Sequence, residues 1–284
     1  MFDASNQALL QRLEELATLE TVSPFSVAFY RLILRIVADA PREEASRLAC
    51  AALLDVELRY HRELKRLAEL PEVGFADLRS AGEKHRIGLE SVEDFAARLT
   101  DGNGRTAAAS QLVLAECYYH LRRTEKVVAA LERAEQLGVD DPLVHFALGY
   151  NRYALALETF TEAGEKEGEL TVRDPLSFQV QCLRAVGAFE NGLTGDELDA
   201  QLYWWIGTVL EAAGLTDAAQ DAYDRSSALF AENEQREGEG ESAATRGVGS
   251  APAITEEEVR LAGELLKGRF APSEIMGIDA EEGS

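Results

Sequence analysis

Apolar residues recur at helical spacing along most of the chain, and almost no segment alternates with the period of a β-strand. Residues 6–19 place four leucines on one face, and Ser23 followed by Pro24 marks the start of a second helix. Pro41 opens a third helix that continues to about Glu69. These patterns predict an all-α protein with an N-terminal helical bundle over residues 1–100.

The next stretch is less regular. Residues 72–88 are polar and lack a clear apolar stripe, whereas Ser91 and Asp94 resemble a capping box and predict a short helix to about Leu99. Residues 101–104 contain two glycines, an aspartate and an asparagine, which together form a strong helix break. We therefore expect a domain boundary there.

Beyond this break, two segments carry the same order of large and small side chains. In residues 200–229, two apolar helical patterns face each other across a turn at residues 213–216. Gly207 and Ala219 lack bulk, so the helix backbones can approach, and Tyr223 helps to fill the space around them. Residues 108–141 repeat this order, with Leu114, Ala115, Tyr118, Val127, Leu131 and Ala134 at the offsets of Ile206, Gly207, Leu210, Ala219, Tyr223 and Ser226.

This order resembles the tetratricopeptide repeat, a 34-residue helix-turn-helix unit. The resemblance implies antiparallel helix hairpins stacked as a right-handed solenoid over residues 105–231. Members of this family usually bind other proteins and carry no chemistry of their own. The expected function is therefore a non-catalytic protein-protein interaction module, an adaptor or assembly factor that binds a peptide or helix in its concave groove.

The middle of the repeat region is irregular. Helical patterns begin at Pro142 and Pro175, and we interpret them as one lengthened hairpin joined by residues 164–174. In the alternative interpretation, residues 149–151 form a turn, and Tyr153, Ala156, Phe160 and Ala163 lie on the second helix of a shortened repeat.

The resemblance also implies where a partner binds, because the first helix of each repeat forms most of the concave wall. Adjacent helical residues point about 100° apart, so Trp204 and Trp205 can both be buried only if their helix is covered on two sides. Either both pack against neighbouring helices, or one presents an anchor for a partner. The repeat register places these residues on or near the wall: Gln201, Trp204, Trp205, Thr208 and Glu211 from one repeat, and Leu112, Val113, Glu116, Tyr119 and His120 from the other.

The composition of this wall limits the class of partner that is expected to bind there. The carboxylate clamp of one repeat sub-type requires Lys, Asn and Arg on the wall, and these positions hold other residues here. The wall is therefore better suited to an apolar or arginine-bearing peptide helix than to a chaperone C-terminus.

The C-terminal part changes character. Residues 232–254 are rich in Gly, Ser, Ala and Glu and are predicted to form a disordered acidic linker. Thr255 and Glu258 then cap a short amphipathic helix over residues 255–270, with Val259 and Leu266 on its apolar face, before an acidic tail over residues 271–284. We hypothesise that this helix docks on the apolar wall of the same chain; the alternatives are an isolated helix or a contact at the end of the solenoid.

Composition excludes some partners. The 28 basic and 51 acidic residues give a net charge of −23, which repels phosphate backbones, and no basic patch offsets it, so nucleic acid is not an expected partner.

The most apolar run, residues 25–38, contains two arginines and is shorter than the about 20 residues needed to span a bilayer. The three distant cysteines predict buried thiols in a reducing compartment, and the first residues lack a signal-peptide pattern, so we expect a cytoplasmic protein.

The sequence offers no catalytic motif. The four histidines lie on different elements, and none is four residues from another, as a zinc-binding helix would require. Phosphate-binding loops and nucleophile elbows are also absent. We therefore expect no catalytic residues, no metal and no cofactor. Two other functions stay open: a regulatory or sensor protein that binds a small ligand or peptide, and an enzyme whose site has no recognisable motif.

Overall fold

The computed structural model describes residues 5–38, 44–70, 73–100, 104–163, 170–195 and 198–240. These residues form ten helices and one hairpin of two short strands, so the all-α class is confirmed. The contacts divide the chain into two compact units, Met1–Leu148 and Gly149–Ser284, and each is described by itself. No helix in the described ranges has the length and apolar character that crossing a membrane would require.

The first unit is built around α3 (Glu44–Ala68), which contacts α1, α2, α4 and α5. Ser23 caps the helix that starts at Pro24, as predicted, because its hydroxyl accepts a hydrogen bond from the Ser26 amide at 3.1 Å. The fully buried core includes Leu9, Phe29 and Leu53. The other helices of this unit are α1 (Asn6–Ala17), α2 (Pro24–Ala38), α4 (Phe75–Ala97), α5 (Arg105–His120) and α6 (Thr124–Gln136).

The fourth helix corrects the sequence analysis. The short helix predicted to start near Ser91 is wrong, because α4 runs without a break from Phe75 to Ala97. Its buried face is made of small side chains as well as large ones, which weakens the apolar stripe in the sequence. Gly88 allows α4 to approach α3 closely, since a Cβ atom there would lie 3.0 Å from both methyl groups of Val56.

The predicted boundary at residues 101–104 is not where the compact units divide. The division falls inside α7 (Pro142–Phe160), between Leu148 and Gly149. The reason is that α5, the first helix of the repeat region, packs against α2, α3 and α4 as well as α6. Ten of its residues are buried, as in a helix that is surrounded by others. It therefore completes the core of the N-terminal helices.

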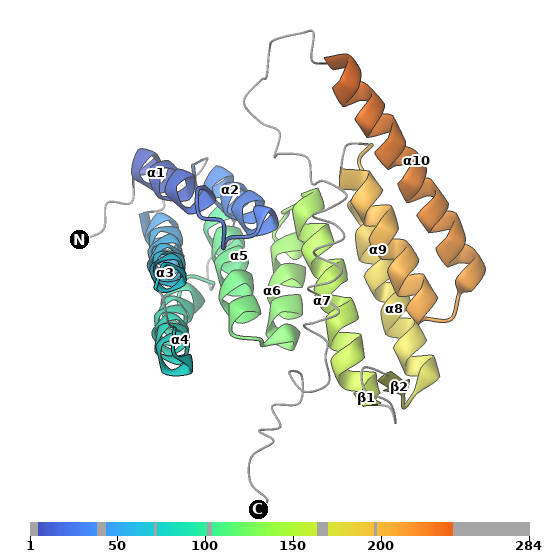
Figure 1. Ribbon diagram of the computed structural model, residues 1–284, viewed down its shortest axis with the longest axis horizontal. Helices are drawn as coiled ribbons and strands as arrows, with labels where there is room; N and C mark the ends of the chain where they lie inside the picture. Colours follow the sequence, from blue (N-terminus) through green and yellow to red (C-terminus); the bar gives the residue numbers. More distant parts are fainter. Residues whose placement is uncertain are drawn as a thin grey trace, which may run out of the picture. The chain divides into compact units, whose positions relative to one another are not determined.

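The second unit confirms the lengthened hairpin, because α7 continues as a helix through residues 149–151 and the alternative turn there is wrong. The connection to the next helix holds a short antiparallel hairpin, with Thr161 opposite Val172, that the sequence analysis missed because three-residue strands show no alternation. The three helices that follow this strand hairpin run side by side (Figure 1). The elements after α7 are β1 (Thr161–Ala163), β2 (Leu170–Val172), α8 (Pro175–Asn191), α9 (Leu198–Ala212) and α10 (Thr216–Gly240).

The last helix is longer than expected. The disordered linker was predicted to begin at residue 232, whereas α10 continues to Gly240. Glu, Gln and Arg are good helix formers, so a polar composition does not by itself end a helix. The remaining linker, the amphipathic helix predicted over residues 255–270 and the acidic tail lie outside the described residues.

Consecutive helices pack closely where a glycine faces an aromatic ring. A Cβ atom on Gly207 of α9 would lie 2.7 Å from ring carbons of Tyr223 on α10, so the predicted close approach is confirmed. Ser226 also ties the two helices, since its buried hydroxyl donates to the Ala200 carbonyl at 2.7 Å. Gly149 of α7 meets the ring of Phe189 on α8 in the same way, at 2.7 Å.

Two glycine substitutions should therefore have opposite effects. Gly207→Ala should lower the free energy of unfolding by about 1–3 kcal/mol, because the new methyl group overpacks against Tyr223. Gly187→Ala should raise it by about 0.5–1 kcal/mol, since no described residue lies within 4 Å of its Cβ position and alanine favours the helix. Urea unfolding followed by tryptophan fluorescence measures both. Equal shifts in the two variants would mean that the Tyr223 contact does not limit the approach of the helices.

Candidate functional site

The first unit buries a group of charged and titratable side chains, which we call the Glu57 cluster: Glu57, His61, His85, Glu116 and His120. Glu57 is only 1% exposed, although it carries a carboxylate. The cluster lies between α3, α4 and α5, which contact one another. A buried carboxylate is costly unless partners compensate its charge.

Three imidazoles face the Glu57 carboxylate. His85 Nε2 lies 2.7 Å from Glu57 Oε1, while His61 Nε2 and His120 Nε2 lie 3.4 and 3.7 Å from Glu57 Oε2. His120 Nε2 also lies 3.4 Å from Glu116 Oε2. Helix geometry explains two of these pairs, because Glu57–His61 and Glu116–His120 are each four residues apart on one helix face.

Hydroxyl groups and an aromatic ring surround the imidazoles. Thr21 Oγ1 lies 2.8 Å from His61 Nδ1, and the Tyr30 hydroxyl lies 3.4 Å from His120 Nε2. The Tyr60 ring stacks on His85, with 3.9 Å between centroids and 4° between planes. The cluster and these neighbours therefore connect α2, α3, α4, α5 and the turn before α2.

Burial and the neighbouring imidazoles shift the pKa of Glu57 in opposite directions. Burial by itself raises the pKa of this carboxyl, but the His120 charge and the hydrogen bonds from His61 and His85 outweigh it, so the pKa lies well below its usual range. Burial raises the pKa of Tyr30 well above its ordinary value, and the negative charges of Glu57 and Glu116 raise it further. At neutral pH the cluster thus holds an ionised Glu57 beside a protonated phenol.

The Glu57 cluster combines two carboxylates with three imidazoles. Among the described residues, no group of three or more His, Cys, Asp or Glu side chains is arranged to hold a metal ion. The nearby Cys117 thiol is buried, and burial followed by the charge of Glu116 raises its pKa well above the ordinary value, which makes it a poor nucleophile. Cys50 and Cys182 are also buried free thiols, as predicted.

The sequence analysis missed the Glu57 cluster because it searched for histidines four residues from one another. The available signal was two Glu-x-x-x-His pairs, Glu57 with His61 and Glu116 with His120, on helices with apolar faces. His85 carried no local signal, because only the packing of α4 on α3 brings it to Glu57.

The α5 residues of the predicted groove are mostly buried within the first unit. Leu112 is 0% exposed, and Val113 is buried beside it. Glu116 is 6% exposed and belongs to the Glu57 cluster, as does the half-buried His120. Tyr119 is also half-buried. Their burial follows because α5 packs against α2, α3, α4 and α6, so these side chains contribute to the core.

The α9 residues of the predicted groove lie in the other unit and behave differently. Trp205 is 6% exposed, and its ring lies 5.2 Å from Tyr150 and 6.3 Å from Phe189, so it is a core residue. Trp204 is half-buried and contacts Trp205 edge-to-face at 5.1 Å. Of the two adjacent tryptophans, Trp205 is therefore packed in the core, and Trp204 is partly exposed.

A polar rim accompanies the Trp204 ring, and together they form what we call the Trp204 face: Gln201, Trp204, Thr208 and Glu211. Thr208 donates a hydrogen bond to the Trp204 carbonyl at 3.0 Å. The Tyr223 hydroxyl of α10 donates to Glu211 at 2.9 Å, which fixes one side of the rim. Gln201 and Thr208 are half-buried, and Glu211 is exposed. These four predicted residues therefore do share one face.

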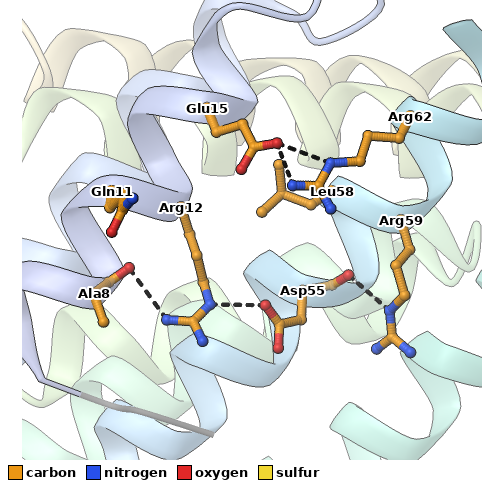
Figure 2. Close-up of a pocket in the computed structure, with 8 residues that line it drawn as sticks. All are labelled: Ala8, Gln11, Arg12, Glu15, Asp55, Leu58, Arg59 and Arg62. Carbon is orange, nitrogen blue, oxygen red and sulfur yellow. Dashed lines mark hydrogen bonds and ion pairs between the residues drawn. The ribbon is translucent and has the colours of Figure 1, made fainter.

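A hollow of about 500 Å³ between α1 and α3 is lined by three arginines and two acids (Figure 2). Arg12 Nε donates to Asp55 at 2.7 Å, and Arg59 Nε donates to the Asp55 carbonyl at 3.0 Å. Arg62 is paired with Glu15 across the same hollow. The side chains that line the hollow thus bridge the two helices, and most of their charge is matched within the wall.

No model of a known protein family matches the sequence, and no curated protein matches it. Among solved structures, the chain is similar to BtubC (BKLC) from P. vanneervenii, with 17% sequence identity and a TM-score of 0.38. That alignment covers 88% of this chain and 98% of the BtubC chain.

Proposed function

We propose that this chain is a non-catalytic protein-binding module made of tetratricopeptide-like helix pairs, which acts as a cytoplasmic adaptor or assembly factor. The observation that carries the proposal is the contact of Gly207 with the Tyr223 ring, where a Cβ atom would lie 2.7 Å away. Ala115 and Leu131 stand at the same offsets in the α5–α6 pair, and both are buried. Such a repeated pairing is typical of scaffolds that bind polypeptides.

The proposed binding surface is the Trp204 face of the second unit. A half-buried indole with a polar rim has the composition of an interface anchor, in which one large ring is desolvated and hydrogen-bonding groups surround it. The Glu211 carboxylate at the rim and the net charge of −23 favour a basic partner. We therefore propose a peptide or helix with an apolar anchor and arginine or lysine beside it.

The Glu57 cluster favours a second function, that of a sensor whose binding state responds to protonation. Three imidazoles face the buried Glu57 carboxylate from α3, α4 and α5, so a change of charge within the cluster would act on the packing of these three helices. This sensor would bind its ligand at another surface of the chain, because Glu57 is 1% exposed and cannot touch a ligand directly.

The binding proposal predicts that Trp204→Ala weakens a partner without unfolding the chain. Removal of a tryptophan anchor costs about 2 kcal/mol or more, which corresponds to an about 30-fold increase in Kd. Partners captured from the source cells by cross-linking should be identified by mass spectrometry, and their Kd for both variants measured by calorimetry.

Phe75→Ala provides a matched control, because Phe75 is a large aromatic residue of the first unit and is 80% exposed. It should leave the Kd of the same partner unchanged. If Trp204→Ala keeps the wild-type far-UV spectrum and also the wild-type Kd for every captured partner, the Trp204 face is not the binding surface.

A further inference from the structure

Helix α8 is apolar on two faces, and the described residues of the second unit bury one of them. The buried face includes Phe178 and Phe189. The opposite side carries Leu176, Val180 and Leu183, which are 77%, 50% and 46% exposed. Their spacing of four and three residues places them on one stripe, and Gly187 continues it, with no described residue within 4 Å of its Cβ position. We call these four residues the α8 row.

A row of this kind differs from scattered apolar residues on a surface. Single exposed leucines are normal, whereas three large apolar side chains aligned within two helical turns form a row that another apolar surface can cover. The charge of α8 supports this, since the helix carries one basic residue, Arg184, and one acidic residue, Glu190, in a chain of net charge −23. The α8 row therefore suits an apolar occupant, and the helix does not repel one that also carries acids.

The chain itself contains a segment of matching pattern. Residues 255–270 place Val259, Ala262, Leu266 and Phe270 on one face of the predicted helix. From Val259 to Phe270 and from Leu176 to Gly187 the separation is the same, so each apolar row would extend about 16 Å along its helix. Glutamates at 256–258 precede this face and would lie beyond the row.

The connecting chain is long enough to bring the two together. Helix α10 ends at Gly240, and residues 241–254 span a root-mean-square distance of about 20 Å. Helix α10 packs on α9, and α9 packs on α8. Packed helices lie about 8–10 Å apart, so α8 is about 20 Å from α10. A covalent connection of this length gives an effective concentration in the millimolar range, and even a weak contact is then occupied.

We propose that residues 255–270 fold as a helix whose Val259, Leu266 and Phe270 face packs on the α8 row of the same chain. The inference stands apart from partner binding at the Trp204 face, which lies on α9. It also moves the docking site from the apolar wall that the sequence predicts to helix α8. On α9, Trp205 is buried, and the outward side offers only the half-buried Trp204 ring within a polar rim. Helix α8 instead offers a row of exposed apolar side chains.

Hydrogen exchange on the full chain tests the proposal. An isolated helix of this length is marginal in water, so its amides should be protected only if it is docked. In the wild type, amides of residues 259–270 should exchange about tenfold or more slowly than expected for an unstructured peptide. Leu176→Glu with Val180→Glu should abolish this protection, and Phe75→Glu, at an 80% exposed residue of the first unit, should leave it intact.

Three results would overturn the proposal. The amides of residues 259–270 could exchange at the unstructured rate in the wild type, or they could stay protected in the Leu176→Glu, Val180→Glu variant. Protection that rises with protein concentration would identify a second copy of the chain as the occupant in place of the same chain. None of these outcomes bears on the Kd at the Trp204 face, so the two proposals fail separately.

Discussion

Replacement of Glu57 by glutamine is expected to lower the free energy of unfolding by about 3 kcal/mol at pH 7, because it removes one partner of a buried charge cluster. Glutamine keeps the shape of the side chain, which is 1% exposed, but it has no negative charge to set against His61, His85 and His120. Urea unfolding followed by far-UV circular dichroism measures this loss, since both tryptophans lie in the other unit.

Glu63→Gln is the matched control on the same helix, because the Glu63 carboxylate lies at the surface and pairs with Arg66 three residues away. The unfolding midpoint of this variant should equal that of the wild type. If Glu57→Gln also leaves the midpoint unchanged, then the imidazoles do not hold Glu57 as an ion, and the Glu57 cluster is only a set of neutral hydrogen bonds.

The dependence of the free energy of unfolding on pH shows whether Glu57→Gln acts through the lost charge or through the changed shape of the side chain. The pKa of Glu57 is lowered in the folded protein from its ordinary value of 4.5, so its contribution to stability is complete above that pH. The contribution is lost as the pH falls through the lower folded-state pKa, because the carboxyl is then protonated in both states. The gap between wild type and variant should therefore shrink below about pH 4.5. If the difference in the free energy of unfolding stayed the same at every pH, the loss would arise from the changed shape of the side chain and not from its charge.

The helical elements were largely predictable because each has a local signal. Ser23 and Pro24 start α2 where the capping pattern places it, and the close approach at Gly207 follows from the order of small and large residues. Helix α4 escaped prediction because its inner face includes Gly88 and His85, which do not register as apolar. The division of the units escaped because it depends on which helices surround α5, a property of packing that no local pattern contains.

The candidate sites were less predictable for the same reason. The repeat register placed Trp204 and Glu211 on one face of α9, as the structure has them, because helical periodicity determines such a face. It could not say that Leu112 is 0% exposed, since burial depends on neighbours distant in sequence. The Glu57 cluster requires three helices to meet, and the exposed row on α8 becomes visible only once its buried face is known.

Phe189→Ala is expected to lower the free energy of unfolding of the second unit by about 3–5 kcal/mol, the usual cost of deleting a buried aromatic ring. The ring is 0% exposed, lies against Gly149 and stacks near Trp205 with 6.3 Å between centroids. Tryptophan fluorescence in urea reports this loss directly, and Trp205 should emit at longer wavelength in the native variant. Glu190→Ala, next to Phe189 but exposed, should behave as wild type.

A second substitution shows whether the cost arises from the contact between α7 and α8. Gly149→Ala alone should destabilise the wild type, because the added Cβ atom would lie 2.7 Å from the Phe189 ring. In the Phe189→Ala background the same change should be neutral or stabilising, since the methyl group enters the cavity and alanine favours the helix. The two effects are thus expected to be strongly non-additive, which is the signature of residues in direct contact. Additive losses would mean that Gly149 and Phe189 stabilise the unit independently, and that the glycine is not there to admit the ring.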